Sequence, residues 1–229
     1  MGRVDLVASH LFPSLPVTTQ TGVRYFRGLE KFRLYDTRRL PGREASEVEP
    51  PSLSVRFCCD KPWPVADETD EGWLKYEGEV HKLVAERIPG EALSPTSQWS
   101  DHISSDPVAT VFAEKEKIHK SVGEIPKTLV VSEPVFLTLQ THRRILNRLR
   151  NTCIAGREQL RMVFDVEYFL VARADIWNKD GLLCYVPAKP GPGEIALGYT
   201  FTFRRDSDPY YDVQLVDANA GFYWANATA

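Results

Sequence analysis

Alternation of apolar and polar residues with a period of two most strongly constrains how this chain folds, and it begins near residue 160. In LRMVFDVEYFLVARADIW, the apolar positions of one face are Met162, Phe164, Val166, Tyr168 and Leu170. Asp165 and Glu167 fall on the opposite face. Successive side chains of a strand point to opposite faces, so the pattern predicts a half-buried strand. GLLCYVP, EIALGYTFTFRR and YYDVQLVDA follow with short connections, which predicts an antiparallel meander.

Helical periodicity is found earlier in the chain. In ADETDEGWLKYEGEVHKLVAERIPG, apolar residues from Trp73 to Ile88 recur at helical spacing behind an acidic start, and Pro89-Gly90 follows. VATVFAEKEKIHKS predicts a shorter helix whose inward residues are Val108, Val111, Phe112 and Ile118. These two segments predict helices packed along their apolar faces.

A third helix is predicted over residues 141–155, from a Thr141 cap to a left-handed Gly156. Its predicted apolar side consists of Ile145, Leu146, Leu149, Cys153 and Ile154. The rest of this helix is basic.

Several shorter segments have strand or loop character. SLSVRFCC predicts a strand over residues 52–59, and VRYFRGLEKFRLY predicts one or two strands over 23–35. TLVVSEPVFLTLQ is β-rich but interrupted by Pro134, which predicts two short strands or an edge strand. Proline and charge predict loops over DTRRLPGREASEVEPPS and around 93–107.

These elements predict an α+β fold with a mostly antiparallel sheet, the C-terminal meander, and two to three helices inserted between early strands. Residues 1–21 contain two prolines and a TTQT run and are predicted to form an extended arm. Residues 22–229 are predicted to form a single domain. A chain of 229 residues is long enough to bury a substantial core.

Charge and cysteine content exclude several classes of protein. The chain has 28 Lys and Arg against 31 Asp and Glu, a formal charge of -3, so no overall field attracts nucleic acid or an anionic membrane. Cys58, Cys59, Cys153 and Cys184 lack the spacing of a zinc site or a disulfide scaffold. Neither a signal peptide nor a transmembrane run is recognisable, so we expect a soluble, intracellular, cytoplasmic protein.

Catalytic and metal-binding motifs are absent from the sequence. None of H-x-x-E-H, G-x-S-x-G, G-x-x-x-x-G-K-S/T or G-x-G-x-x-G occurs, and the five histidines lack metal-ligand spacing. No catalytic residue, metal or cofactor is therefore predicted, which favours a non-enzymatic protein. An enzyme whose site forms only in the fold remains a third alternative, with Asp165, Glu167 and His142 as its first candidates.

The predicted basic helix is the best candidate for a polyanion or acidic partner. Its candidate binding residues are His142, Arg143, Arg144, Arg148 and Arg150. Tyr199 and Phe201 share one face of the strand GYTFTF and are candidates for stacking on bases. An RNA-binding protein that uses this helix is the second functional alternative.

The chain ends in a neutral segment, because no charged residue follows Asp217. Phe222, Tyr223 and Trp224 lie in it and predict either a last strand packed on its own sheet or a segment that docks on another subunit. Together with the arm and the missing catalytic motifs, this favours a non-enzymatic, self-associating structural or interaction protein, such as a viral matrix or coat subunit. Its expected partners are further copies of itself, and RNA or an acidic protein.

Overall fold

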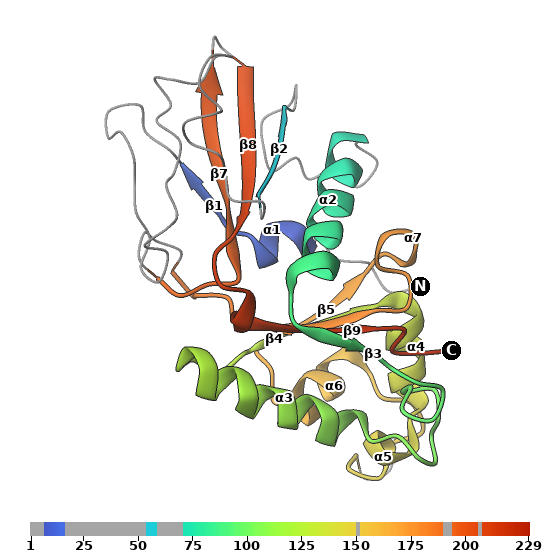
Figure 1. Cartoon of the computed structure of the whole chain (residues 1–229). Coiled ribbons are helices and arrows are strands. Elements are labelled where there is room, and N and C mark those ends of the chain that lie inside the picture. Colours follow the sequence, from blue (N-terminus) through green and yellow to red (C-terminus); the bar gives the residue numbers. More distant parts are fainter. Residues whose placement is uncertain (1–6, 17–53, 59–70, 150–151, 190–193, 206–207) are drawn as a thin grey trace. The chain divides into compact units, whose positions relative to one another are not determined.

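The computed structural model describes residues 7–16, 54–58, 71–149, 152–189, 194–205 and 208–229 (Figure 1). The chain divides into two compact units. The first unit consists of Met1–Val7, Ile88–Tyr185 and Asn219–Ala229, and the second of Ala8–Arg87 and Val186–Ala218. Each unit has a sheet and helices, so the predicted α+β class is confirmed. The division into an arm and one domain stays a prediction.

The first unit contains a five-stranded sheet of order β3-β9-β6-β4-β5. Its strands are β3 (Gly90–Ala92), β9 (Gly221–Ala225), β6 (Gly181–Cys184), β4 (Thr128–Ser132) and β5 (Tyr168–Ala172). β6 runs antiparallel to β4 and β9, but β3 is parallel to β9 and β4 is parallel to β5. The sheet is therefore mixed, and the predicted C-terminal meander is wrong, because β6 lies between strands that are distant from it in sequence.

β4 lies in the interior of this sheet, and all of its residues are buried. The segment predicted as two short strands or an edge is instead β4 followed by the helix α4 (Glu133–Thr141). Pro134 stands in the first turn of α4. A proline fits there because that N–H has no partner inside a helix. The proline thus marks a helix start, and it does not interrupt a sheet.

The helix α3 (Pro107–Val122) begins at Asp106, whose carboxylate accepts a hydrogen bond from the N–H of Ala109 at 3.1 Å. In Figure 1, α3 and α6 (Arg157–Val163) lie along one face of the five-stranded sheet. Three predicted inward residues of α3 are buried in the core, namely Val108, Val111 and Ile118. Phe112 is 39% exposed, so its predicted inward position is wrong.

The prediction of one long basic helix over residues 141–155 is wrong. The short helix α5 (Arg143–Leu146) occupies the first part of this segment. Cys153 and Ile154, which were predicted on the apolar side, are exposed. Gly156 precedes α6 as its N-cap, and it does not end the earlier helix. Local spacing was compatible with one helix, but the chain turns after α5 so that Ile145 and Leu160 both reach the core.

The strand predicted to begin near residue 160 begins later, at Tyr168. Residues up to Val163 belong to α6, and Met162 is 62% exposed. Asp165 has a φ of 50°, which breaks the extended conformation. Lys115 donates hydrogen bonds to the backbone carbonyls of Phe164 and Asp165 and so holds this turn. The predicted half-buried strand is also wrong in β5, because Phe169 to Ala172 are all buried and Tyr168, which was predicted to be on the apolar face, is 45% exposed. Phe169 and Val171 belong to the core, so β5 is covered on both faces.

The second unit contains a four-stranded sheet of order β1-β7-β8-β2. Its elements are β1 (Ser14–Pro16), β2 (Ser54–Cys58), β7 (Gly198–Arg205), β8 (Asp208–Leu215), and the helices α1 (Val7–Leu11) and α2 (Glu71–Arg87). β7 and β8 form the predicted antiparallel pair, and β2 falls within the predicted strand. Within the predicted arm, the described residues form α1 and β1, so the helical part of the arm is not extended.

The described members of the predicted apolar stripe from Trp73 to Ile88 are buried, so that part of the prediction is confirmed in and directly after α2. The Tyr76 hydroxyl lies 2.6 Å from Oγ1 of Thr200 in β7, and the Ala8 N–H donates to Oε1 of Glu77 at 2.9 Å. These bonds link α2 to the sheet and to α1. The side chain of Trp73 and the predicted strands over 23–35 lie outside the described residues. No helix of the described parts is long and apolar enough to cross a membrane.

Candidate interaction surfaces

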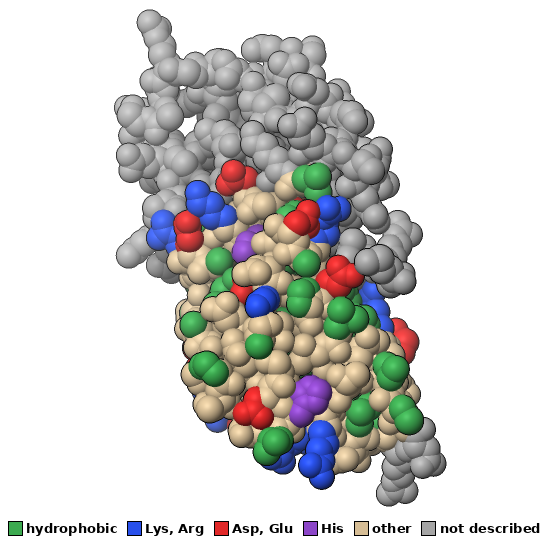
Figure 2. Space-filling view, turned by 90° about the vertical axis from the view of Figure 1, so that its right-hand side faces the viewer, with side chains coloured by type: hydrophobic (Ala, Val, Ile, Leu, Met, Phe, Trp, Pro, Cys, Tyr) green, Lys and Arg blue, Asp and Glu red, His purple; other side chains and the backbone are tan. Residues whose placement is uncertain are grey.

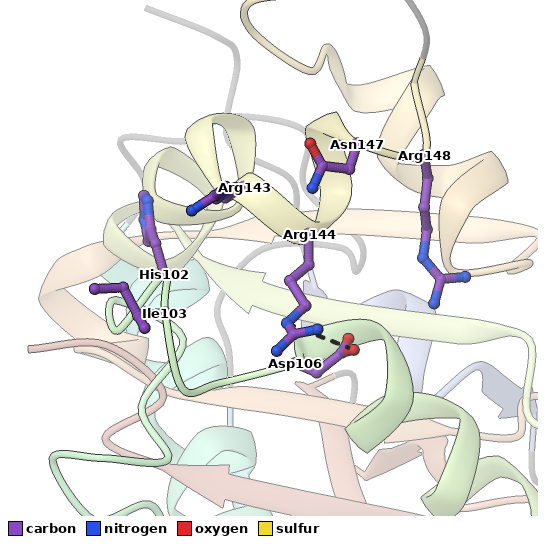
Figure 3. Close-up of a pocket in the computed structure, with 7 residues that line it drawn as sticks. All are labelled: His102, Ile103, Asp106, Arg143, Arg144, Asn147 and Arg148. Atoms are coloured by element: carbon purple, nitrogen blue, oxygen red, sulfur yellow. Dashed lines mark ion pairs between the residues drawn. The ribbon is translucent and has the colours of Figure 1, made fainter.

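A cleft of about 450 Å³ opens on the first unit beside α5 (Figure 3). We call it the basic cleft, and its lining residues are His102, Ile103, Asp106, Arg143, Arg144, Asn147 and Arg148. Three come from the loop before α3, and four come from α5 and the turn after it. The structure therefore brings Arg143, Arg144 and Arg148 of the predicted binding set to one surface. Arg150 of that set lies outside the described residues.

The charges in the basic cleft are only partly compensated. Nε of Arg144 lies 3.9 Å from Oδ2 of Asp106, the ion pair drawn in Figure 3. Among the described residues, neither the Arg143 nor the Arg148 side chain has an ion-pair or hydrogen-bond partner. Over the face shown in Figure 2, basic, acidic and hydrophobic side chains are interspersed, as expected for a net charge of -3. The positive character of the cleft is therefore local.

His142 is placed differently from its predicted role as a cation. Its ring is fully buried, and burial first and His102 second lower its pKa to about 4. Nδ1 accepts a hydrogen bond from the N–H of Arg144 at 3.2 Å, and Nε2 lies 3.1 Å from Oγ of Ser105. Nδ1 is thus the acceptor, and the proton of the neutral ring lies on Nε2. His142 is neutral at pH 7, so it fixes the start of α5 and does not bind an anion.

The loop on the other side of the cleft is also held by hydrogen bonds. The carboxylate of Asp101 accepts from the N–H groups of Ile103 and Ser104, both at 3.0 Å. These backbone hydrogen bonds lower the pKa of Asp101. Ser105 donates its hydroxyl proton to the carbonyl of Asp101 at 2.6 Å. The two walls of the cleft are thereby joined through Ser105 and His142.

Sequence reasoning missed His102, Ile103, Asp106 and Asn147 as parts of this surface. Asp106 carried a usable signal, because Asp before Pro107 at the start of an apolar run is typical of a helix N-cap. That signal places Asp106 at a helix end, but it does not predict that α5 lies beside it.

The C-terminal segment forms the inner strand β9, where Trp224 is fully buried and Tyr223 is 7% exposed. The Trp224 ring lies 5.3 Å from those of Trp99 and Phe222. Of the two alternatives for this segment, the structure matches a strand packed on its own sheet. Tyr223 and Trp224 are enclosed in the core of the first unit, and of the predicted interface residues only Phe222 is partly accessible.

Hydrogen bonds to neighbouring segments fix the residues after β9. The Tyr223 hydroxyl donates to Oδ2 of Asp180, and the N–H of Asn226 donates to Oδ1 of the same carboxylate at 3.0 Å. The N–H of Trp99 donates to the carbonyl of Ala227 at 2.7 Å. The neutral composition of this segment is therefore explained by burial, since a charged side chain here would lose its hydration.

The remaining candidates are not arranged for their predicted roles. Tyr199 is fully buried, so its ring is not available for stacking on a base, and the side chain of Phe201 lies outside the described residues. Asp165 lies 3.3 Å from the ammonium of Lys115, and Glu167 lies 3.8 Å from that of Lys127. Both carboxylates are exposed. They precede β5 and do not share one strand face, contrary to the prediction.

The described residues contain no group of His, Cys, Asp and Glu that could hold a metal ion. What the structure brings together at the basic cleft is a surface suited to binding.

Comparison with solved structures identifies the class of fold first. The chain resembles the crystal structure of a phage-related protein from Bordetella bronchiseptica RB50, with a TM-score of 0.63 and 21% sequence identity, over 97% of this chain and 92% of that chain. The sequence is also 24% identical, over 94% of this chain and 83% of the other protein, to the major capsid protein of Burkholderia phage BcepMu. No protein-family profile matches the chain. The similarity to a major capsid protein supports a structural role of the viral coat type, and it gives RNA binding no support.

Proposed function

We propose that this chain is the coat subunit of a phage capsid and that copies of it associate into a shell. The observation that carries the proposal is the similarity to a phage major capsid protein along 94% of the chain. A relationship over nearly the whole length involves both compact units, and so it does not reflect one shared motif.

The surface of the first unit also supports self-association. Large apolar side chains are exposed on it, and they are Ile103, Phe112, Ile125, Leu137, Ile154, Met162 and Tyr168. Apolar side chains at the surface supply contact area when copies associate, and the fully buried centre of such interfaces is more apolar than the rest of a protein surface. Both compact units are built around their own sheets, so each unit presents a preformed surface.

The test is the mass and shape of the purified chain at increasing concentration. Light scattering after size exclusion and electron microscopy of negatively stained samples are expected to show closed particles of uniform size. Nuclease treatment should leave these particles intact, because the association is between protein surfaces. A monomer at every concentration, or particles that dissolve on nuclease treatment, would contradict the proposal.

A further inference from the structure

We propose that the basic cleft binds the turn at Glu124 and Ile125 of a second copy of this chain, with Arg148 holding the Glu124 carboxylate. The inference rests on the proposed self-association and names one of its contacts.

The cleft provides the positive half of the contact. The side chains of Arg143 and Arg148 are exposed and have no ion-pair or hydrogen-bond partner among the described residues. The 3.9 Å between Nε of Arg144 and Oδ2 of Asp106 is too long for a hydrogen bond. A guanidinium carries five N–H donors in a planar fork that matches a carboxylate in a bidentate geometry. A carboxylate that enters the cleft would therefore meet unused donors.

The lining of the cleft favours a protein segment over a nucleic acid. Ile103 is 80% exposed at the cleft and offers an apolar contact that a phosphate backbone does not use. Asp106 places a negative charge in the same lining and would repel a run of phosphates. A cavity of about 450 Å³ also suits a few side chains rather than an extended strand. The ligand chemistry that fits is one carboxylate beside one apolar side chain.

This combination occurs at the turn that connects α3 to β4. Glu124 is exposed and has no ion-pair or hydrogen-bond partner within the described ranges, and Ile125 beside it is 50% exposed. Gly123, with a φ of 81°, ends α3 directly before them and turns the chain outward. Elsewhere in the described residues, the carboxylates of Asp175 and Glu167 also adjoin an apolar residue, but each pairs with a cation of its own unit. Exposed Glu194 also adjoins an apolar residue, but Ile195 is half-buried, whereas Ile125 is 50% exposed and offers more apolar surface.

The cleft is also rigid before any partner arrives. The neutral ring of His142 bonds to the N–H of Arg144 and reaches Ser105, and the carbonyl of Asp101 accepts from Ser105 on the opposite wall. A rigid site loses less conformational entropy on binding than a mobile one. The arginines are thus presented from a fixed backbone.

Charge reversal and its rescue test the contact. The variants are Glu124→Arg, Arg148→Glu and the two combined, with Glu86→Arg as the control because Glu86 is exposed and has no partner among the described residues. Light scattering gives the concentration at half-assembly, and circular dichroism confirms folding. Each single reversal is expected to raise that concentration by roughly tenfold or more, since like charges oppose each other at the contact. The combined variant is expected to return near the wild-type value, and the control to match it.

Two outcomes would overturn the inference and leave the proposed function standing. In the first, the wild type assembles and the single reversals do not change the concentration at half-assembly. In the second, the single reversals raise that concentration but the combined variant does not restore it. A second measurement does not depend on assembly. A labelled peptide of residues 121–128, SVGEIPKT, is titrated with the subunit under dissociating conditions. Binding that is lost in the Arg143→Ala/Arg148→Ala variant and in a peptide with Gln at position 124 supports the contact even if no particle forms. Absence of binding, or tighter binding of a short oligonucleotide than of the peptide at the same salt concentration, would overturn it.

Discussion

Trp224 gives the sharpest stability prediction, because its side chain is fully buried and its indole N–H has no hydrogen-bond acceptor among the described residues. The residue lies in β9, with its ring 5.3 Å from those of Trp99 and Phe222. Two substitutions separate these features. Trp224→Ala removes the ring and leaves a cavity, whereas Trp224→Phe keeps an aromatic ring and removes only the outer part of the indole with its unpaired N–H.

The expected magnitudes follow from burial. A buried aromatic side chain removes roughly 150–250 Å² from water, which at about 25 cal/mol per Å² is roughly 4–6 kcal/mol. Measured losses for Trp→Ala in protein cores are about 3–5 kcal/mol, so we expect a loss of about 4 kcal/mol in the free energy of unfolding. Trp224→Phe should lose about 1 kcal/mol or less, because removing an unpaired buried donor offsets part of the lost contact area.

The assay is denaturant unfolding of the dissociated subunit, followed by far-ultraviolet circular dichroism. If the two compact units unfold separately, the transition of the first unit is the one compared. The control is Ile103→Ala, an 80% exposed position expected to change stability by less than about 0.5 kcal/mol. A loss below about 1 kcal/mol for Trp224→Ala would refute the burial of β9. A loss above about 2 kcal/mol for Trp224→Phe would refute the unpaired donor.

Further predictions concern pH and two glycines. His142 is fully buried, and its pKa is lowered from 6.5 to about 4. The histidine therefore binds a proton more readily in the unfolded chain than in the folded one. The free energy of unfolding should fall by roughly 3 kcal/mol as the pH drops from about 6.5 to 4. Unfolding midpoints across that range should show a smaller decline in His142→Asn, and an unchanged decline would contradict this. Gly198→Ala would press a Cβ against the ring of Phe12 and the backbone carbonyl of Gln214, so thermal unfolding should show a loss of roughly 1–3 kcal/mol. Gly78→Ala in α2 meets nothing within 4 Å and should gain up to about 1 kcal/mol in the same measurement; a loss there would show that α2 is not helical at that residue.

Local sequence patterns predicted the elements whose stabilisation is local. The α2 stripe from Tyr76 to Ile88 was readable because helical spacing alone places these residues on one face. The pair β7 and β8 was readable because two alternating runs flank a short turn. At Pro134, the same residue is compatible with a broken strand or a helix start, and only the burial of β4 on both faces decides for the helix.

The candidate site divides in the same way. The positive charge of Arg143, Arg144 and Arg148 is a property of composition, and it is enough to mark this segment as a binding candidate. The neutrality of His142 was not predictable, because a histidine pKa depends on burial and on neighbours such as His102, which is distant in sequence.

By itself, the sequence determined the α+β class, the amphipathic helix α2, the hairpin of β7 and β8, and the absence of charge in the segment that became β9. The tertiary structure alone decided the parallel pairings of β3 with β9 and β4 with β5, and it decided that the loop before α3 forms one wall of the basic cleft. The physical reason is the separation in sequence of the residues that interact. Periodicity within a segment determines which of its faces is apolar. Which other segment covers that face depends on packing between residues that are far apart in the chain.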